Sequence, residues 1–108
     1  MLEKDDFTIT KRNLPHWKMK GATYFITANL MKGILTDVEQ QIVYDHIKNG
    51  HPEHYELLAM TIMPDHFHLI FMTEKDLSAV MKSMKGIASR KINIRRGTTG
   101  TNWQDESY

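Results

Sequence analysis

The chain has 108 residues, which is enough for one domain with its own core. Its 41% hydrophobic and 25% charged residues argue against disorder, and no run approaches the roughly 20 apolar residues of a membrane-spanning helix. The absence of cysteine excludes disulfides and thiolate metal sites, and the charged start, Met1 to Asp6, does not resemble a signal peptide. We therefore expect a cytoplasmic protein without a membrane partner.

The first part of the chain is predicted to be an arm followed by a strand. Residues 1–20 are polar and turn-rich, so we interpret them as an extended N-terminal arm and residues 21–108 as the folded domain. Ala22–Leu30 follows Gly21 and is rich in aromatic and β-branched residues, which predicts a strand.

A helix is expected next. Thr36 and Glu39 have the spacing of a capping box, which marks its start. Asn49-Gly50 favours a left-handed C-terminal turn, and Pro52 prevents the helix from continuing. The predicted apolar stripe recurs at helical spacing: Val38, Ile42, Val43 and Ile47.

Two further strands and a second helix follow. The runs Tyr55–Met63 and His66–Thr73 are joined at Pro64-Asp65, so an antiparallel hairpin is the simplest pairing. Asp76 is a good N-cap, and residues 97–102 are a loop by composition. The buried face of the second helix is predicted to contain Leu77, Val80, Met81, Met84, Ile87 and Ala88.

This order, with a fourth strand expected near the end of the chain, is the split βαβ pattern. We therefore predict an α+β, ferredoxin-like sandwich. Its antiparallel sheet would carry two helices on one face and leave the other face open for a ligand. Many functions use this architecture, so it does not define the activity.

Charge is distributed unevenly. The chain has a net charge of +1, yet between Glu74 and Arg96 seven basic residues oppose two acidic ones, a local charge of +5. Such a segment can contact phosphate, although a solvated helix face is the more common explanation. The seven basic residues are Lys75, Lys82, Lys85, Arg90, Lys91, Arg95 and Arg96.

His66 and His68 are the most informative residues. Side chains alternate along a strand, so these two share one face while Phe67 lies on the other. Their α-carbons would be about 6–7 Å apart, close enough for both rings to bind one metal ion. Two ligands do not complete a coordination sphere. The other histidines are interpreted as structural or solvated: His16, His46, His51 and His54.

Three separated motifs resemble one protein family. Met63–Ile70 is similar to the histidine–hydrophobic–histidine signature of the single-tyrosine HUH transposases, of the insertion-sequence 200 type. Arg12–Trp17 followed by Gly21–Thr27 resembles the opening of the REP-associated tyrosine transposases, and 103–108 resembles a segment that follows their second helix. In this order the motifs cover roughly residues 12–108.

The resemblance implies a specific chemistry. Such proteins bind single-stranded DNA that carries a hairpin. A divalent ion, Mg²⁺ or Mn²⁺, is held by the two histidines, here His66 and His68, and by a further polar ligand, and it polarises the scissile phosphate. A helical tyrosine attacks, leaving a 5′-phosphotyrosine link and a free 3′-hydroxyl, so the strand can be rejoined without ATP.

The attacking tyrosine itself is not identified. In the family it lies on a third helix beyond the Trp103-Gln104 segment, whereas Tyr108 lies within that segment. Tyr24, Tyr44 and Tyr55 are interpreted as core, edge or helix-surface residues. We therefore assign no catalytic residue and expect a C-terminally truncated domain that binds hairpin-bearing DNA without cleaving it.

Two other functions remain open. One is a DNA-binding module without chemistry, and the other is an RNA-binding domain of the RRM type, which expects aromatics where this chain has His66 and His68. The oligomeric state, a homodimer included, and the DNA target are not determined by the sequence. The residues expected to contact DNA are Arg12, Trp17, Lys82, Lys85, Arg90 and Lys91.

Overall fold

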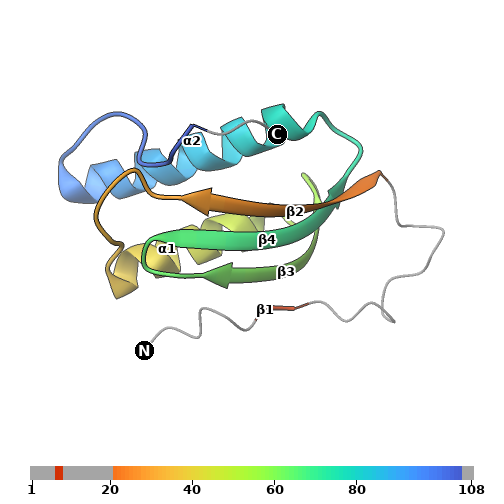
Figure 1. The fold of residues 1–108 in the computed structure, drawn as a ribbon, viewed down its shortest axis with the longest axis horizontal. Helices are drawn as coiled ribbons and strands as arrows, with labels where there is room; N and C mark the ends of the chain where they lie inside the picture. Colours follow the sequence, from red (N-terminus) through yellow and green to blue (C-terminus); the bar gives the residue numbers. More distant parts are fainter. Residues whose placement is uncertain (1–6, 9–20, 106–108) are drawn as a thin grey trace.

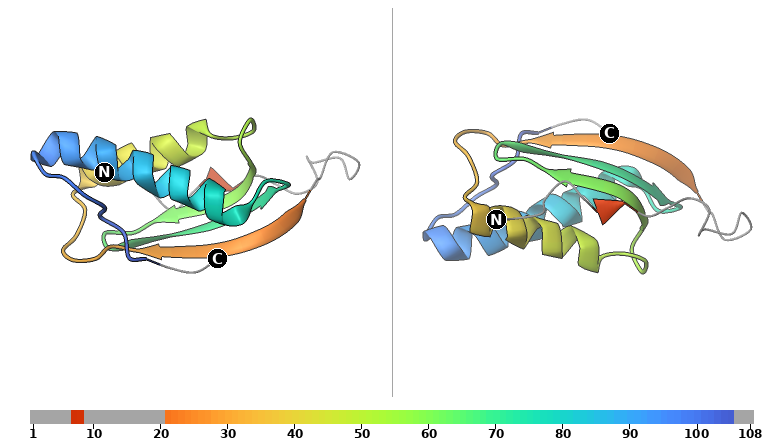
Figure 2. Two further views of the ribbon diagram at one scale, coloured as in Figure 1. Left: turned by 90° about the horizontal axis from the view of Figure 1, so that it is seen from above. Right: turned by 90° about the horizontal axis from the view of Figure 1, so that it is seen from below.

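The protein is an antiparallel sheet with two helices packed on one face, as predicted. The computed structural model describes residues 7–8 and 21–105. The strands pair in the order β1-β3-β4-β2, all antiparallel, and Figures 1 and 2 show α1 and α2 on the same side of the sheet. The elements are β1 (Phe7–Thr8), β2 (Ala22–Asn29), α1 (Asp37–Asn49), β3 (Glu56–Ile62), β4 (His66–Thr73) and α2 (Leu77–Arg96).

Strand alternation decides which side chains form the core. On β4, Phe67, Leu69 and Phe71 are at most 1% exposed and face the helices. On β2, Ile26 and Ala28 are also buried, at 8% and 0% exposed, and face the helices. The alternate side chains of these strands, at odd positions on β2 and even positions on β4, therefore project from the face of the sheet that neither α1 nor α2 covers, which we call the open face.

The predicted helix starts are confirmed. Thr36 and Glu39 form the reciprocal capping box of α1, and the Asp76 side chain accepts a hydrogen bond from the Ala79 backbone at the start of α2. Gly97 ends α2 in the left-handed conformation, with φ 70°.

Two details of α1 differ from the prediction. Gly50 is right-handed, with φ −76°, rather than left-handed. A side chain at Gly50 would overlap the hydroxyl of Tyr55, so steric space explains this glycine rather than backbone conformation. Val38, in the first turn of α1, is 50% exposed and does not belong to the buried stripe.

The outer strands also differ from the prediction. Phe7–Thr8, inside the predicted arm, pairs with β3 at one edge of the sheet. At the other edge, the expected strand after α2 is reduced, up to residue 105, to a single bridge between Leu30 and Trp103. A loop of glycine and threonine precedes this bridge, so extended pairing does not develop before Trp103 is reached.

An ion pair between a buried carboxylate and a partly exposed guanidinium joins the start of α1 to the end of α2. Arg96 donates from Nε to Glu39 Oε2 at 2.6 Å and from an Nη atom to Glu39 Oε1 at 2.7 Å. Glu39 is only 2% exposed, and its hydrogen bonds with Arg96 lower its pKa from 4.5 to about 2. Within residues 21–105, neither helix is long and apolar enough to cross a membrane.

Candidate metal site and nucleic-acid surface

The two histidines of β4 point at each other on the open face. Their Nε2 atoms are 3.2 Å apart, and their ring centroids are separated by 4.7 Å. β4 is a central strand, flanked by β3 and β2. The predicted placement of His66 and His68 on one side of a central strand is therefore confirmed, whereas metal binding by them stays a prediction.

Each ring is held by a hydrogen bond at its other nitrogen. His66 Nδ1 lies 2.7 Å from Asp65 Oδ1, and because a carboxylate can only accept, Nδ1 carries the hydrogen. In the neutral ring, His66 Nε2 is then a bare acceptor. His68 Nδ1 lies 2.8 Å from the hydroxyl of Thr27, which can donate or accept.

The two Nε2 atoms fit a shared cation. When His68 donates from Nδ1 to Thr27, both Nε2 lone pairs point at the same space and repel each other unless a cation or a proton lies between them. Metal–nitrogen bonds are about 2.1 Å long, so nitrogens 3.2 Å apart can bind one ion together. The hydrogen bonds to Asp65 and Thr27 are of the kind that orients histidine rings in metal sites.

The protein supplies only part of a coordination sphere here. Among the described residues, no group of three or more His, Cys, Asp or Glu side chains could hold a metal ion. Water and phosphate oxygens commonly fill the remaining positions around Mg²⁺, which keeps several waters in protein sites.

A buried aromatic pair supports the histidines from below. Phe67 lies between them in sequence and packs edge-on against Trp103, with ring centroids 5.0 Å apart. Trp103 is 1% exposed, and hydrogen bonds from Met31 to Asn102 and from Gln104 to Asn29 fix its segment to the β2 edge. The sequence showed Trp103 only as part of a family motif, because its packing against Phe67 depends on the fold.

The basic side chains of α2 lie in the other layer of the molecule. Lys82 and Lys85 line a groove of about 690 Å³ between α2 and the segment at the β2 edge, and the Lys85 ammonium donates to the Gln104 carbonyl at 2.9 Å. Arg90 lines a second, adjoining groove, and Lys91 is exposed. The fold therefore does not bring these residues together with the histidines, which project from the opposite face of the sheet.

The tyrosines do not supply a nucleophile on the open face within residues 21–105. Tyr24 and Tyr55 both pack on Phe71 in the core, and Tyr44, on α1, packs against the core from the helical layer. Arg12, His16, Trp17 and Tyr108, which the sequence analysis also considered, lie outside the described residues.

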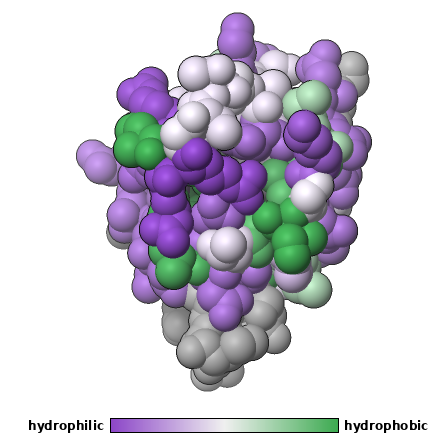
Figure 3. Space-filling view, turned by 90° about the vertical axis from the view of Figure 1, so that its left-hand side faces the viewer, coloured by the Kyte–Doolittle hydropathy of each residue, from purple (hydrophilic) through white to green (hydrophobic). Residues whose placement is uncertain are grey.

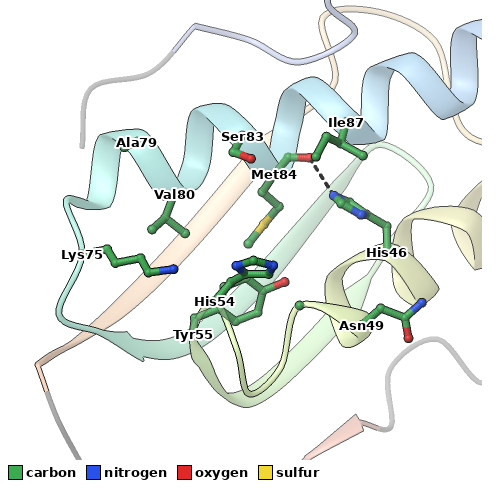
Figure 4. A pocket seen from close by; sticks show the side chains of 11 residues that line it. His46, Asn49, His54, Tyr55, Lys75, Ala79, Val80, Ser83, Met84 and Ile87 are labelled. Atoms are coloured by element: carbon green, nitrogen blue, oxygen red, sulfur yellow. Dashed lines mark hydrogen bonds between the residues drawn. The ribbon is translucent and has the colours of Figure 1, made fainter.

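A separate pocket of about 330 Å³ lies between α1 and α2 (Figure 4). His46, His54 and Lys75 are among the residues that line it, and His46 Nε2 is 3.2 Å from the Met84 carbonyl. Burial lowers the pKa of His46, which favours its neutral form. His51 accepts a hydrogen bond from the Leu57 backbone, so His46 and His51 have structural contacts, as the sequence analysis expected.

Apolar side chains are also exposed where α1 begins and α2 ends. Ile34, Val38 and Ile94 are at least half exposed there. Figure 3 views the molecule from this end and shows apolar side chains in separate patches among hydrophilic ones. This end therefore lacks a continuous apolar surface within the described residues.

Comparison with known proteins identifies the family of the chain. The family model of IS200-like transposases matches residues 23–108. A solved structure of a REP-associated tyrosine transposase bound to a REP hairpin matches with a TM-score of 0.64 and 21% identity, over 98% of this chain and 59% of that one. The chain thus spans somewhat more than half the length of that relative, and no curated protein matches it. Because the family model covers most of its length, the chain belongs to the IS200-like transposases.

Proposed function

We propose that this chain binds hairpin-bearing single-stranded DNA and that it forms the metal-binding part of a single-tyrosine HUH transposase. In the full-length enzyme, a tyrosine from outside the described residues would nick the strand and later rejoin it through a 5′-phosphotyrosine intermediate. The observation that carries the proposal is the 3.2 Å separation of the His66 and His68 Nε2 atoms on the open face.

The roles of the site residues follow from their contacts. His66 and His68 would hold one divalent cation, Mg²⁺ or Mn²⁺, through Nε2. When bound, this cation would polarise the scissile phosphate and stabilise the negative charge that develops on it. Asp65 and Thr27 would keep the ring nitrogens facing that position through their hydrogen bonds to Nδ1.

The basic residues of α2 would bind DNA phosphates away from the histidines. Lys82, Lys85, Arg90 and Lys91 would supply affinity that does not depend on base sequence. Because α2 and the open face lie on opposite sides of the sheet, DNA that contacts both has to pass around an edge. The groove lined by Lys82, Lys85 and Gln104 lies at the β2 edge, so we assign the passage to that edge.

Metal binding to the purified chain tests this proposal directly. We expect Mn²⁺ titration, followed by calorimetry and by the loss of free-ion electron paramagnetic resonance signal, to reveal one site. Replacing His66 and His68 together by alanine should abolish it. Thr27→Val removes only the hydrogen bond to His68 and should weaken Mn²⁺ binding about 10- to 100-fold.

His54→Ala is the matched control, because this exposed histidine lies on the other side of the molecule. The same proteins are then titrated with a fluorescent hairpin carrying a single-stranded flank, and with a fully paired duplex of the same sequence. The proposal requires preference for the hairpin with its flank. Equal Mn²⁺ loss in His54→Ala and the double variant, or tighter binding to the duplex, would contradict it.

A further inference from the structure

One large aromatic side chain stands on the open face with little cover. Phe25, on β2, is 77% exposed. By contrast, Phe67 and Phe71 on β4 are fully buried. Phe25 is flanked along its own face of the strand by Thr23 and Thr27, which are both exposed. The ring therefore contributes little to the core and is accessible to a ligand on the open face.

The sheet register places Phe25 next to the histidine pair. Thr27 is opposite His68, and two residues earlier Phe25 is opposite Ile70. Ile70 is in turn opposite Ala59 of β3, so an apolar row crosses the sheet beside the row that contains His68. Neighbouring rows on one face are separated by about 6.5 Å, which is two residues along a strand.

We propose that Phe25 is a stacking site for a base of the single-stranded DNA whose phosphate lies at the histidine pair. This inference rests on the proposed function and names the base contact that accompanies it. A phosphate held near His68 leaves its own base, or the adjacent one, within reach of the Phe25 row. Aromatic rings on an open sheet face bind unpaired bases by stacking. This contact does not depend on base sequence, because every base has a flat aromatic face.

The apolar row favours a base over other occupants for two reasons. It is narrow, with one aromatic ring and the small or aliphatic side chains of Ile70 and Ala59 beside it, and it is bordered by polar residues at Thr23 and Thr27. It is also continuous with the nitrogen pair that would hold a phosphate-bound cation. A second copy of the chain on this face would have to bury His66 and His68 as well.

Substitution of Phe25 separates stacking from other effects. We expect Phe25→Ala to weaken binding of a fluorescein-labelled hairpin with a single-stranded flank about 5- to 150-fold, the range for loss of one base–aromatic stack. Phe25→Trp should keep the affinity. Val38→Ala, which shortens a half-exposed side chain in the first turn of α1, should leave it unchanged.

Changes in the DNA identify which base stacks on Phe25. Abasic sites are introduced one at a time along the flank; at one position the loss should be large for the unmodified protein and absent for Phe25→Ala. Light scattering during size-exclusion chromatography reports whether Phe25→Ala dissociates a dimer, which would assign the face to a second copy instead. If the unmodified protein does not bind this DNA, the proposed function and this inference both fail. If it binds and Phe25→Ala binds equally well, only the stacking site is wrong.

Discussion

The two faces of β4 are built from one run of eight residues but have different tasks. On the helix side, Phe67, Leu69 and Phe71 are almost completely buried. On the open side, His66 is partly exposed and His68 is exposed, and their hydrogen bonds go to polar neighbours rather than to the core. One set of side chains on β4 therefore packs in the core, and the other set places the histidine pair on the open face.

This division has a physical consequence for substitution. A side chain on the helix face is surrounded by other apolar groups, so its removal leaves a cavity. The exposed His68 on the open face mainly contacts solvent, so its removal should change stability little. Neighbouring positions on β4 should therefore affect different properties of the protein: stability on the helix side and ligand binding on the open side.

The largest effect is expected from Phe67→Ala. Phe67 is fully buried and packs on Trp103, so its truncation should lower the free energy of unfolding by about 3–5 kcal/mol. The adjacent His68→Ala should lower it by no more than about 0.5 kcal/mol. Urea unfolding followed by circular dichroism measures both, and similar losses for the two variants would show that the faces are not separate.

The second test concerns the helical layer and its ion pair. The native pKa of Glu39 is lowered to about 2, so its pairing with Arg96 stabilises the fold above pH 4.5 and is lost as the pH falls toward 2. The unmodified protein should lose up to about 3 kcal/mol of stability over that range through this group. Glu39→Gln should lack this pH-dependent stabilisation, and its free energy of unfolding at pH 7 should be lower than that of the unmodified protein.

Urea unfolding at several pH values between 7 and 2 measures the difference between the two proteins. Glu53→Gln, at an exposed position in the loop after α1, is the control and should retain the pH dependence of the parent. Parallel curves for Glu39→Gln and the parent would mean that Arg96 does not hold this carboxylate in its charged form.

The smallest effect on stability is expected on the exposed side of α2. Lys82 and Arg90 are both exposed, so replacing both by glutamine should change stability by no more than about 0.5 kcal/mol per site. DNA binding should nevertheless weaken, and the slope of log affinity against log salt should fall by up to about two. Fluorescence anisotropy over a salt series gives the slope, with Lys48→Gln on α1 for comparison; an unchanged slope would restrict DNA to the open face.

Much of the fold could be predicted because local patterns determine it. Alternation along β4 identified both the buried phenylalanine and the histidine pair, and the capping box at Thr36 marked the start of α1 correctly. These features depend on residues within a few positions of one another, so no tertiary information is needed to infer them.

The remainder depends on contacts between distant residues. The hydrogen bond between Thr27 and His68 and the position of Phe25 beside that row follow from strand register, which spacing in the sequence does not reveal. Gly50 was misinterpreted because its neighbour, Tyr55, approaches only after the loop folds. The edge strand at Phe7–Thr8 was missed because two residues give too short a pattern.

The bridge between Leu30 and Trp103 also sets where later residues begin. Gln104 is bonded to Asn29, whose register partner on β4 is His66, so the chain is fixed about two strand spacings, roughly 10 Å, from the histidine pair. Any group joined to Gln104 by a short flexible tether would be held close to that pair, at an effective concentration in the millimolar range. A substitution that loosens the packing of Trp103 would lower the effective concentration of any such group at the site while leaving both histidines in place.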